Sequence, residues 1–300
     1  MITRPMLAGK CTNLHKIQFP VIGSPKIDGI RCLRINGRSL SRSFKLIPNK
    51  WIQYCLENLP NGLDGELVGT HDFGLKLDNF QQTTSKIMTY SGVPEFKYLI
   101  FDYVSSDLNE PYIHRLVQLK KLSEFLPNYC EILPNTKLYS LQDLATYQEN
   151  ILFMGYEGIC IRKFRGPYKC GRSTENEGYL LKIKPYEDAE AIIIGFDEQL
   201  TNTNSPEKDN FGRIKRSSAK YGKIGSNTLG KFKVKGLTAF KGLQFNVGTG
   251  IGLTKELRQR IWNNPEHYID KIIIFKYQKV GTKDLPRSPV FKGFRDKEDI

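Results

Sequence analysis

The chain has 300 residues, 39% of them hydrophobic, and a net charge of +14 from 45 basic and 31 acidic residues. This length suits two domains better than one, and the charge favours a polyanionic partner over a generically basic surface. No apolar run approaches the length of a membrane-spanning helix, residues 1–5 lack a secretory signal, and the six cysteines form no C-x-x-C pair. We therefore expect an intracellular protein with no membrane partner and no structural zinc.

Short β-prone runs and helical segments alternate through the first 187 residues. Residues 17–35 alternate apolar runs with turns, and Asn36-Gly37 between β-prone runs predicts a hairpin. Helical periodicity is typical of residues 48–58, 114–126 and 141–154, and places Leu116, Leu119, Leu122 and Phe125 on or near one helix face. Residues 63–69, 98–104, 158–163 and 180–184 are typical of buried strands.

The sequence pattern changes near residue 187. Short β runs follow at residues 191–196, 231–234, 244–247 and 272–277, residues 201–209 predict a polar loop, and residues 254–263 predict one helix with Thr254 as its N-cap. We therefore expect an α+β chain: a domain of antiparallel sheets with flanking helices at 1–187, then a β-barrel OB-fold domain at 188–300. Between residues 210 and 255 there are ten Lys or Arg and no Asp or Glu, which favours phosphate contacts.

The segment at residues 26–31, Lys-Ile-Asp-Gly-Ile-Arg, is the strongest local signal for chemistry. A lysine attacks phosphorus only as the neutral amine, so we expect burial or neighbouring cations to lower the pKa of Lys26. Asp28 would face the same side of an extended chain as Lys26. Gly29 would allow a ligand to approach the backbone, and Arg31 offers a fork of donors to phosphate or ribose. An ordinary Asp-Gly turn is the alternative interpretation.

Six motifs in order resemble those of the covalent nucleotidyltransferase superfamily, which contains ATP-dependent DNA ligases, RNA ligases and mRNA capping enzymes. They lie at residues 26–31, 41–44, 63–67, 99–103, 157–162 and 181–184. The resemblance implies a nucleotidyltransferase (adenylation) domain in which Lys26 attacks ATP, with Mg²⁺, or Mn²⁺ in its place, as the metal. It further implies roles for Arg42 at nucleic-acid phosphate, Glu66 at the nucleotide and metal, Phe101 at adenine, Glu157 at the metal, and Lys182 and Lys184 at the α-phosphate.

Further runs at residues 80–85, 168–174, 208–212, 248–250 and 286–291 extend the resemblance over essentially the whole chain, to the minimal two-domain DNA ligases of large algal viruses. This resemblance implies a virus-encoded monomer that clamps nicked duplex DNA in the infected host cell. The implied nick contacts are Phe80, Thr89, Lys169 and Arg172. The implied β-hairpin latch, at about residues 200–227, carries Arg213, Lys215, Arg216, Lys220 and Lys223.

The segment at residues 286–299 resembles the sixth ligase motif, in which Arg287 and Arg295 would orient the leaving pyrophosphate. The chain departs from the family pattern at Ser288, where an aromatic residue is more usual, and at Cys160, where many relatives have a larger apolar residue. Three alternatives stay open: an mRNA capping guanylyltransferase, which needs no DNA clamp; an RNA ligase, which usually lacks this C-terminal domain; and a non-enzymatic OB-fold nucleic-acid binder. The long basic stretch and the pattern from Arg287 onward favour the DNA ligase.

Overall fold

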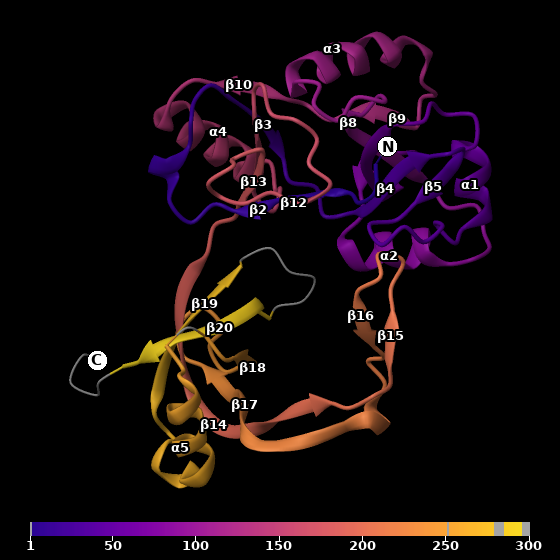
Figure 1. Cartoon of the computed structure of the whole chain (residues 1–300). Coiled ribbons are helices and arrows are strands. Elements are labelled where there is room, and N and C mark those ends of the chain that lie inside the picture. The colour runs from indigo at the N-terminus through magenta and orange to yellow at the C-terminus, as the bar shows by residue number, and fades with distance from the viewer. Residues whose placement is uncertain (1, 251, 279–284, 296–300) are drawn as a thin grey trace. The chain divides into compact units, whose positions relative to one another are not determined.

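A computed structural model describes residues 2–250, 252–278 and 285–295. The chain divides into two compact units, Met1–Lys184 and Pro185–Ile300 (Figure 1). None of the helices in the described part of the chain combines the length and the apolar character that a membrane crossing requires. Each unit is described below by itself.

The first unit contains two mixed sheets with helices packed around them (Figure 1). One sheet has the order β10 (Thr136–Leu138), β3 (Val21–Pro25), β11 (Ile159–Lys163), β13 (Leu180–Ile183) and β2 (Gly9–Lys10). The other has the order β5 (Arg38–Leu40), β4 (Ile30–Ile35), β6 (Leu63–His71), β8 (Phe96–Tyr103) and β9 (Cys130–Ile132), with β7 (Lys76–Leu77) on β6. A short pair joins β1 (Met6–Leu7) to β12 (Gly171–Arg172). The helices are α1 (Lys50–Leu56), α2 (Phe80–Met88), α3 (Tyr112–Leu122) and α4 (Leu141–Phe153), with 3-10 turns η1 (Leu14–Lys16) and η2 (Ser123–Phe125).

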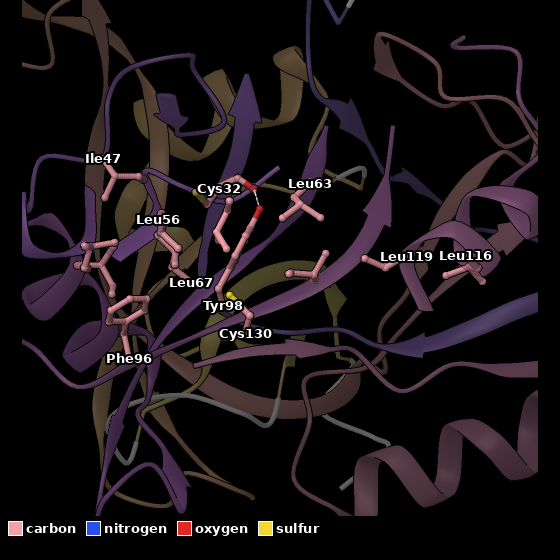
Figure 2. Close-up of a cluster of buried hydrophobic side chains, with 14 of the residues drawn as sticks. Cys32, Ile47, Leu56, Leu63, Leu67, Phe96, Tyr98, Leu116, Leu119 and Cys130 are labelled. Atoms are coloured by element: carbon pink, nitrogen blue, oxygen red, sulfur yellow. Dashed lines mark hydrogen bonds between the residues drawn. The ribbon is translucent and has the colours of Figure 1, made fainter. Parts of the chain in front are cut away.

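The expected antiparallel pairing holds through both sheets except at one edge of each. The pairs β13–β2 and β8–β9 are parallel. The largest core of this unit joins the second sheet to its helices, and its labelled side chains are spread along the sheet in Figure 2. Tyr98 is fully buried there and donates from its hydroxyl to the Cys32 carbonyl at 2.9 Å, which satisfies the one polar group that the ring brings into the core.

Most predicted elements of this unit are confirmed. Asn36 and Gly37 form the two-residue turn between β4 and β5, both with positive φ, as a tight hairpin requires. The predicted helix at 114–126 is wrong at its end, because α3 stops at Leu122 and the side chain of Phe125 is 83% exposed. Helix α2 was not predicted: Thr83 and Ile87 are its only buried residues, and it begins at a capping box made by Asn79 and Gln82.

The second unit is built on the closed five-stranded barrel that the sequence predicted (Figure 1). Its order is β14 (Glu187–Asn202), β17 (Lys223–Gly236), β18 (Gln244–Gly248), β20 (Arg287–Phe294) and β19 (Ile272–Gln278), back to β14. Helix α5 (Lys255–Asn263) packs on β17, and the side chain of Thr254 caps it by accepting from Leu257 N, as predicted. The 3-10 turns are η3 (Lys220–Gly222) and η4 (Pro265–His267).

Two expectations for this unit are wrong in detail. Strands β14 and β17 are 16 and 14 residues long, far longer than the short runs predicted, because their partly exposed halves continue the pairing beyond the apolar segments. Residues 201–209 are not a plain loop, since β15 (Pro206–Lys208) pairs with β16 (Ile214–Arg216) in a separate hairpin (Figure 1).

Candidate active site

Three neighbouring strands of the first sheet bring distant parts of the chain to one site. Ser24 on β3 lies opposite Cys160 on β11, which in turn lies opposite Lys182 on β13. Lys26 follows the end of β3, and its backbone N–H donates to the Gly158 carbonyl at 2.8 Å. The antiparallel register therefore places the residues just after β3 and β13 beside those just before β11.

The pairing of β3, β11 and β13 brings two lysines and one glutamate together in an ion cluster. Lys26 Nζ lies 2.5 Å from Glu157 Oε2, and Lys184 Nζ pairs with the other carboxylate oxygen, Oε1. Burial alone would lower the pKa of Lys26, but the attraction of Glu157 outweighs it and raises that pKa above its ordinary value. The expectation of a lowered pKa is therefore wrong for the ligand-free protein. The pKa of Lys182, by contrast, is lowered by burial and by the charges of Lys184 and Arg172.

The second sheet supplies a paired arginine and glutamate. Arg31 on β4 lies opposite Glu66 on β6, and its guanidinium binds Asp64 through Nε at 2.5 Å and Nη2 at 2.6 Å. Burial raises the pKa of Glu66 to about 7, although Arg31 and Lys26 oppose the rise. Within the described part of the chain, Glu66 Oε2 is buried with no hydrogen-bond partner. Such an acceptor is costly unless a ligand satisfies it.

Two cationic groups lie close to the ring of Phe101 on β8. The guanidinium carbon of Arg31 lies 4.6 Å from the ring centre of Phe101, and that of Arg162 lies 5.2 Å from it. Arg162 is itself fixed by a hydrogen bond from Nη1 to Asp102 Oδ2 at 3.0 Å, and Asp102 is fully buried. These contacts fix the ring without covering it, because Phe101 still lines a cavity.

That cavity has a volume of about 250 Å³, and both apolar and cationic side chains line it. Apolar side chains, among them Ile27, Phe101 and Leu133, suit a planar base. The cationic lining residues are Lys26, Arg31, Arg42, Arg162, Arg172, Lys182 and Lys184, and the acidic one is Glu66. An apolar slot beside this excess of positive charge fits a nucleoside polyphosphate.

The structure brings most of the predicted nucleotide-site residues together, with some exceptions. Among the described residues that line the cavity, neither Asp28 nor Glu157 appears, although Glu157 contacts two lysines that do. Arg287 and Arg295 belong to the second unit, where Arg295 Nη1 lies 2.8 Å from Glu190 Oε1.

The predicted nucleic-acid residues fall into three groups. Arg42 and Arg172 are exposed at the cavity. Phe80 begins α2 and Thr89 caps its C-terminus, and Lys169 is paired with Glu177 at 2.6 Å, which helps to lower the pKa of Glu177 to about 2. In the second unit the predicted latch residues lie on or just after the β15–β16 hairpin, namely Arg213, Lys215, Arg216, Lys220 and Lys223.

The sequence interpretation missed the buried charges behind the cavity. Asp64 binds Arg31 and accepts from the Tyr168 hydroxyl at 2.8 Å. Asp102 accepts from both Arg115 and Arg162. Two signals were present: Asp64 belongs to the predicted motif at residues 63–67, where it was given no role, and Arg162 is two residues beyond Cys160 on the same strand, so it shares its face.

Comparisons with known proteins agree over both units. A family model described as ATP dependent DNA ligase domain matches residues 5–184, and one described as DNA ligase OB-like domain matches residues 222–295. A crystal structure of Chlorella virus DNA ligase-adenylate is 36% identical, covers 100% of both chains and has a TM-score of 0.57. A Lig E DNA ligase structure, 22% identical with a TM-score of 0.69, covers 98% of this chain and 100% of its own, and supports the fold. The DNA ligase of African swine fever virus is 26% identical over 140 residues, which span 45% of this chain and only 32% of that relative.

Proposed function

The chain belongs to the ATP-dependent DNA ligase family, and we propose that it seals 3′-OH/5′-phosphate nicks in duplex DNA through a covalent AMP adduct on Lys26. The observation that carries this proposal is the cavity in which Lys26 lies with Phe101 and Glu66 and with the cations Lys182 and Lys184. Around the amine of Lys26, the cavity offers the ring of Phe101 for the base, the buried acceptor Glu66, and the cations Lys182 and Lys184 for the phosphates.

In the first step, Lys26 Nζ attacks the α-phosphorus of ATP. An N–P bond forms, the bond from the α-phosphorus to the bridging oxygen breaks, and pyrophosphate leaves. Lys182 and Lys184 would offset the charge that develops on the phosphate oxygens. Because Glu157 stabilises Lys26 as an ammonium, nucleotide binding must weaken that ion pair so that Nζ can release a proton to solvent before the neutral amine attacks.

The metal we propose is Mg²⁺, with Mn²⁺ able to replace it, and Glu66 and Glu157 are the carboxylates that would hold it together with the phosphates of ATP. The buried, unpartnered Oε2 of Glu66 fits either a cation or a ribose hydroxyl. Within the described part of the chain no group of three or more His, Cys, Asp or Glu forms a full metal cage, which suits an ion that takes most of its ligands from phosphate and water. When bound, it would neutralise charge on the phosphates.

In the second and third steps, the AMP would move to the 5′-phosphate of the nick, and the 3′-OH would then attack that phosphate and expel AMP. Asp28, two residues from Lys26, is a further carboxylate that we propose, with Glu66 and Glu157, for the metal and the ribose. The nicked strand would be held by residues of the first unit, namely Arg42, Phe80, Thr89, Lys169 and Arg172. The β15–β16 hairpin would hold the duplex through its basic residues. Arg287 and Arg295 would orient pyrophosphate during the first step. We propose that one copy of the chain clamps the DNA.

The sequence alone also left open an mRNA capping guanylyltransferase, which would transfer GMP to an RNA 5′-diphosphate, and the family matches favour the ligase. The Asn210-to-Lys255 stretch, with ten basic and no acidic residues, favours duplex DNA. A single-turnover assay separates the two: the protein, ATP and Mg²⁺ should convert a nicked duplex with a 5′-phosphate into a continuous strand. No sealing with ATP, together with transfer of GMP to 5′-diphosphate RNA, would reject the ligase proposal.

A further inference from the structure

Polar contacts hold helix α2 on strand β6. The nine residues of the helix bury only Thr83 and Ile87, and a helix this short is marginal in water by itself. The Thr83 hydroxyl accepts from the Gly69 backbone N–H at 3.1 Å, and Lys86 Nζ donates to the Thr70 carbonyl at 2.6 Å. The position of α2 therefore depends on the polar groups that join it to the strand.

One buried carboxylate lies at the centre of these contacts. The side chain of Asp78, one residue before the Asn79 cap of α2, is 2% exposed. Its Oδ1 accepts from His71 Nδ1 at 2.8 Å at the end of β6, and its Oδ2 lies 2.6 Å from Lys86 Nζ in the last turn of α2. Burial alone would raise the pKa of Asp78, but the hydrogen bonds from Lys86 and His71 outweigh it and lower that pKa. Asp78 is therefore an ionised group that joins the strand to both ends of the helix.

The backbone at Gly69 leaves room for this carboxylate. A Cβ at Gly69 would lie 2.4 Å from Asp78 Oδ2. The Asp78 backbone N–H also donates to the Gly69 carbonyl at 2.8 Å. The strand thus accommodates Asp78 at one position, against a residue that has no side chain.

Two residues of α2 that we propose as nick contacts depend on the placement of this helix. Phe80 is its first residue and is 38% exposed. Thr89 is its C-cap, and the Thr89 carbonyl accepts from Asn49 Nδ2 at 3.0 Å. Among the described residues, neither Asp78 nor Lys86 lines the nucleotide cavity. A change at Asp78 should therefore alter the contacts with DNA and leave the reaction with ATP intact.

We propose that Asp78 is a positioning residue for nick binding, which fixes α2 on β6 and so places Phe80 and Thr89 for the DNA. This inference rests on the proposed function, in which α2 contacts the nicked strand. Polar contacts weaken steeply outside a narrow range of distance and angle. A shift of the helix would therefore weaken the contacts at both of its ends together.

The test compares full-length D78N with D72N, a control in the same β6–β7 turn whose carboxylate is 50% exposed and pairs with Lys76. D78N keeps the shape of the side chain and removes its charge. We expect the Kd for nicked duplex DNA to rise at least about fivefold in D78N, with an unchanged rate of AMP-adduct formation. We also expect faster amide hydrogen exchange across residues 81–88. D72N should match wild type in all three measurements.

A second variant keeps the inference testable if D78N folds poorly. K86M removes the partner of Asp78 at a side chain that is 34% exposed, and K76M is its control. K86M should weaken nick binding as D78N does. Because the two groups act as one pair, the double variant D78N/K86M should bind about as weakly as D78N alone and not several-fold more weakly.

Two results would overturn the inference: a D78N protein that binds the nick as tightly as D72N, or a loss of nick binding matched by an equal loss of AMP-adduct formation. The double variant F80A/T89A separates this inference from the proposed function. If F80A/T89A binds nicked duplex DNA as wild type does, α2 is not a DNA contact and that part of the proposed function fails. If F80A/T89A weakens binding and D78N does not, only the positioning role fails.

Discussion

Lys26 Nζ lies 2.5 Å from Glu157 Oε2, although 131 positions separate the two residues in the sequence. The pair is largely buried: the side chain of Lys26 is 20% exposed and that of Glu157 is 2% exposed. The ion pair raises the pKa of Lys26 and so stabilises its ammonium form.

Neutralising Glu157 should therefore make Lys26 more reactive in the ligand-free protein. Burial lowers the pKa of Lys26, and the negative charge of Glu157 is the main effect that raises it. Without that charge, the pKa of Lys26 falls in E157Q and the neutral amine becomes more abundant. We expect labelling of Lys26 by an amine reagent near neutral pH to rise by about tenfold per unit of pKa lost. Peptide mapping by mass spectrometry measures it. K184A, which keeps the Lys26–Glu157 pair, serves as the control, and equal labelling in E157Q and wild type would refute the explanation.

Asp102 should support both stability and the Phe101 platform. It is fully buried and binds Arg115 Nε at 2.8 Å and Arg162 Nη1 at 3.0 Å, so D102N would leave two buried guanidinium groups without their counter-ion. Such a loss costs about 3–5 kcal/mol. Urea unfolding followed by the fluorescence of Trp51, with Trp262 replaced by Phe, reports on the first unit. D107N, at an exposed aspartate, should change little, and a D102N protein as stable as D107N would contradict the prediction.

Glu66 predicts a dependence of stability on pH in the ligand-free protein. Its pKa is raised from 4.5 to about 7 by burial. A carboxyl group with a raised pKa in the folded state stabilises that state fully at a pH below its pKa in the unfolded chain. This stabilisation is lost as the pH rises through the pKa of the folded state. E66Q should therefore gain stability relative to wild type between about pH 5 and about pH 8, by about 3 kcal/mol. Urea unfolding at each pH tests this, with E124Q at an exposed glutamate as the control; a pH-independent difference would show that Glu66 does not titrate in this range.

Lys169 should contribute to nick binding and not to the reaction with ATP. Glu177 holds its ammonium in place at 2.6 Å and 2.8 Å, and Glu177 is itself anchored by the Thr174 backbone N–H at 2.7 Å. K169A should weaken binding to nicked duplex and reduce the slope of log affinity against log salt by about 0.9. K163A is the matched control, because Lys163 contacts Gln18 elsewhere on the surface. An unchanged salt slope in K169A would remove Lys169 from the DNA contacts.

The sequence predicted elements wherever a local signal was strong. The Asn36-Gly37 turn and the Thr254 cap are such cases, because a short stretch of chain determines each. Helix α2 was missed because its sequence is mostly polar and only Thr83 and Ile87 are buried. The end of α3 was misplaced because Phe125 continues the apolar pattern after the helix has stopped.

The site was predictable in its residues and not in its electrostatics. Ordered motifs gave Lys26, Glu66, Phe101, Lys182 and Lys184, and all five line one cavity. No motif indicates that Glu157 reaches Lys26 closely enough to reverse the direction of its pKa shift, since that depends on the register between β3 and β11. The roles of Asp64 and Asp102 were not predicted either, although both lie within the motifs, because only the fold shows which arginine each carboxylate contacts.

The central claim is that Lys26 carries the AMP, and one measurement tests it most directly. The protein is incubated with Mg²⁺ and ATP labelled at the α-phosphate, and the labelled peptide is mapped by mass spectrometry. We predict a single adduct on Lys26, which is lost when a nicked duplex is added and sealed, is absent in K26A and is retained in K45A. An adduct on another lysine, an adduct that survives in K26A, or labelling by GTP and not by ATP would contradict the account.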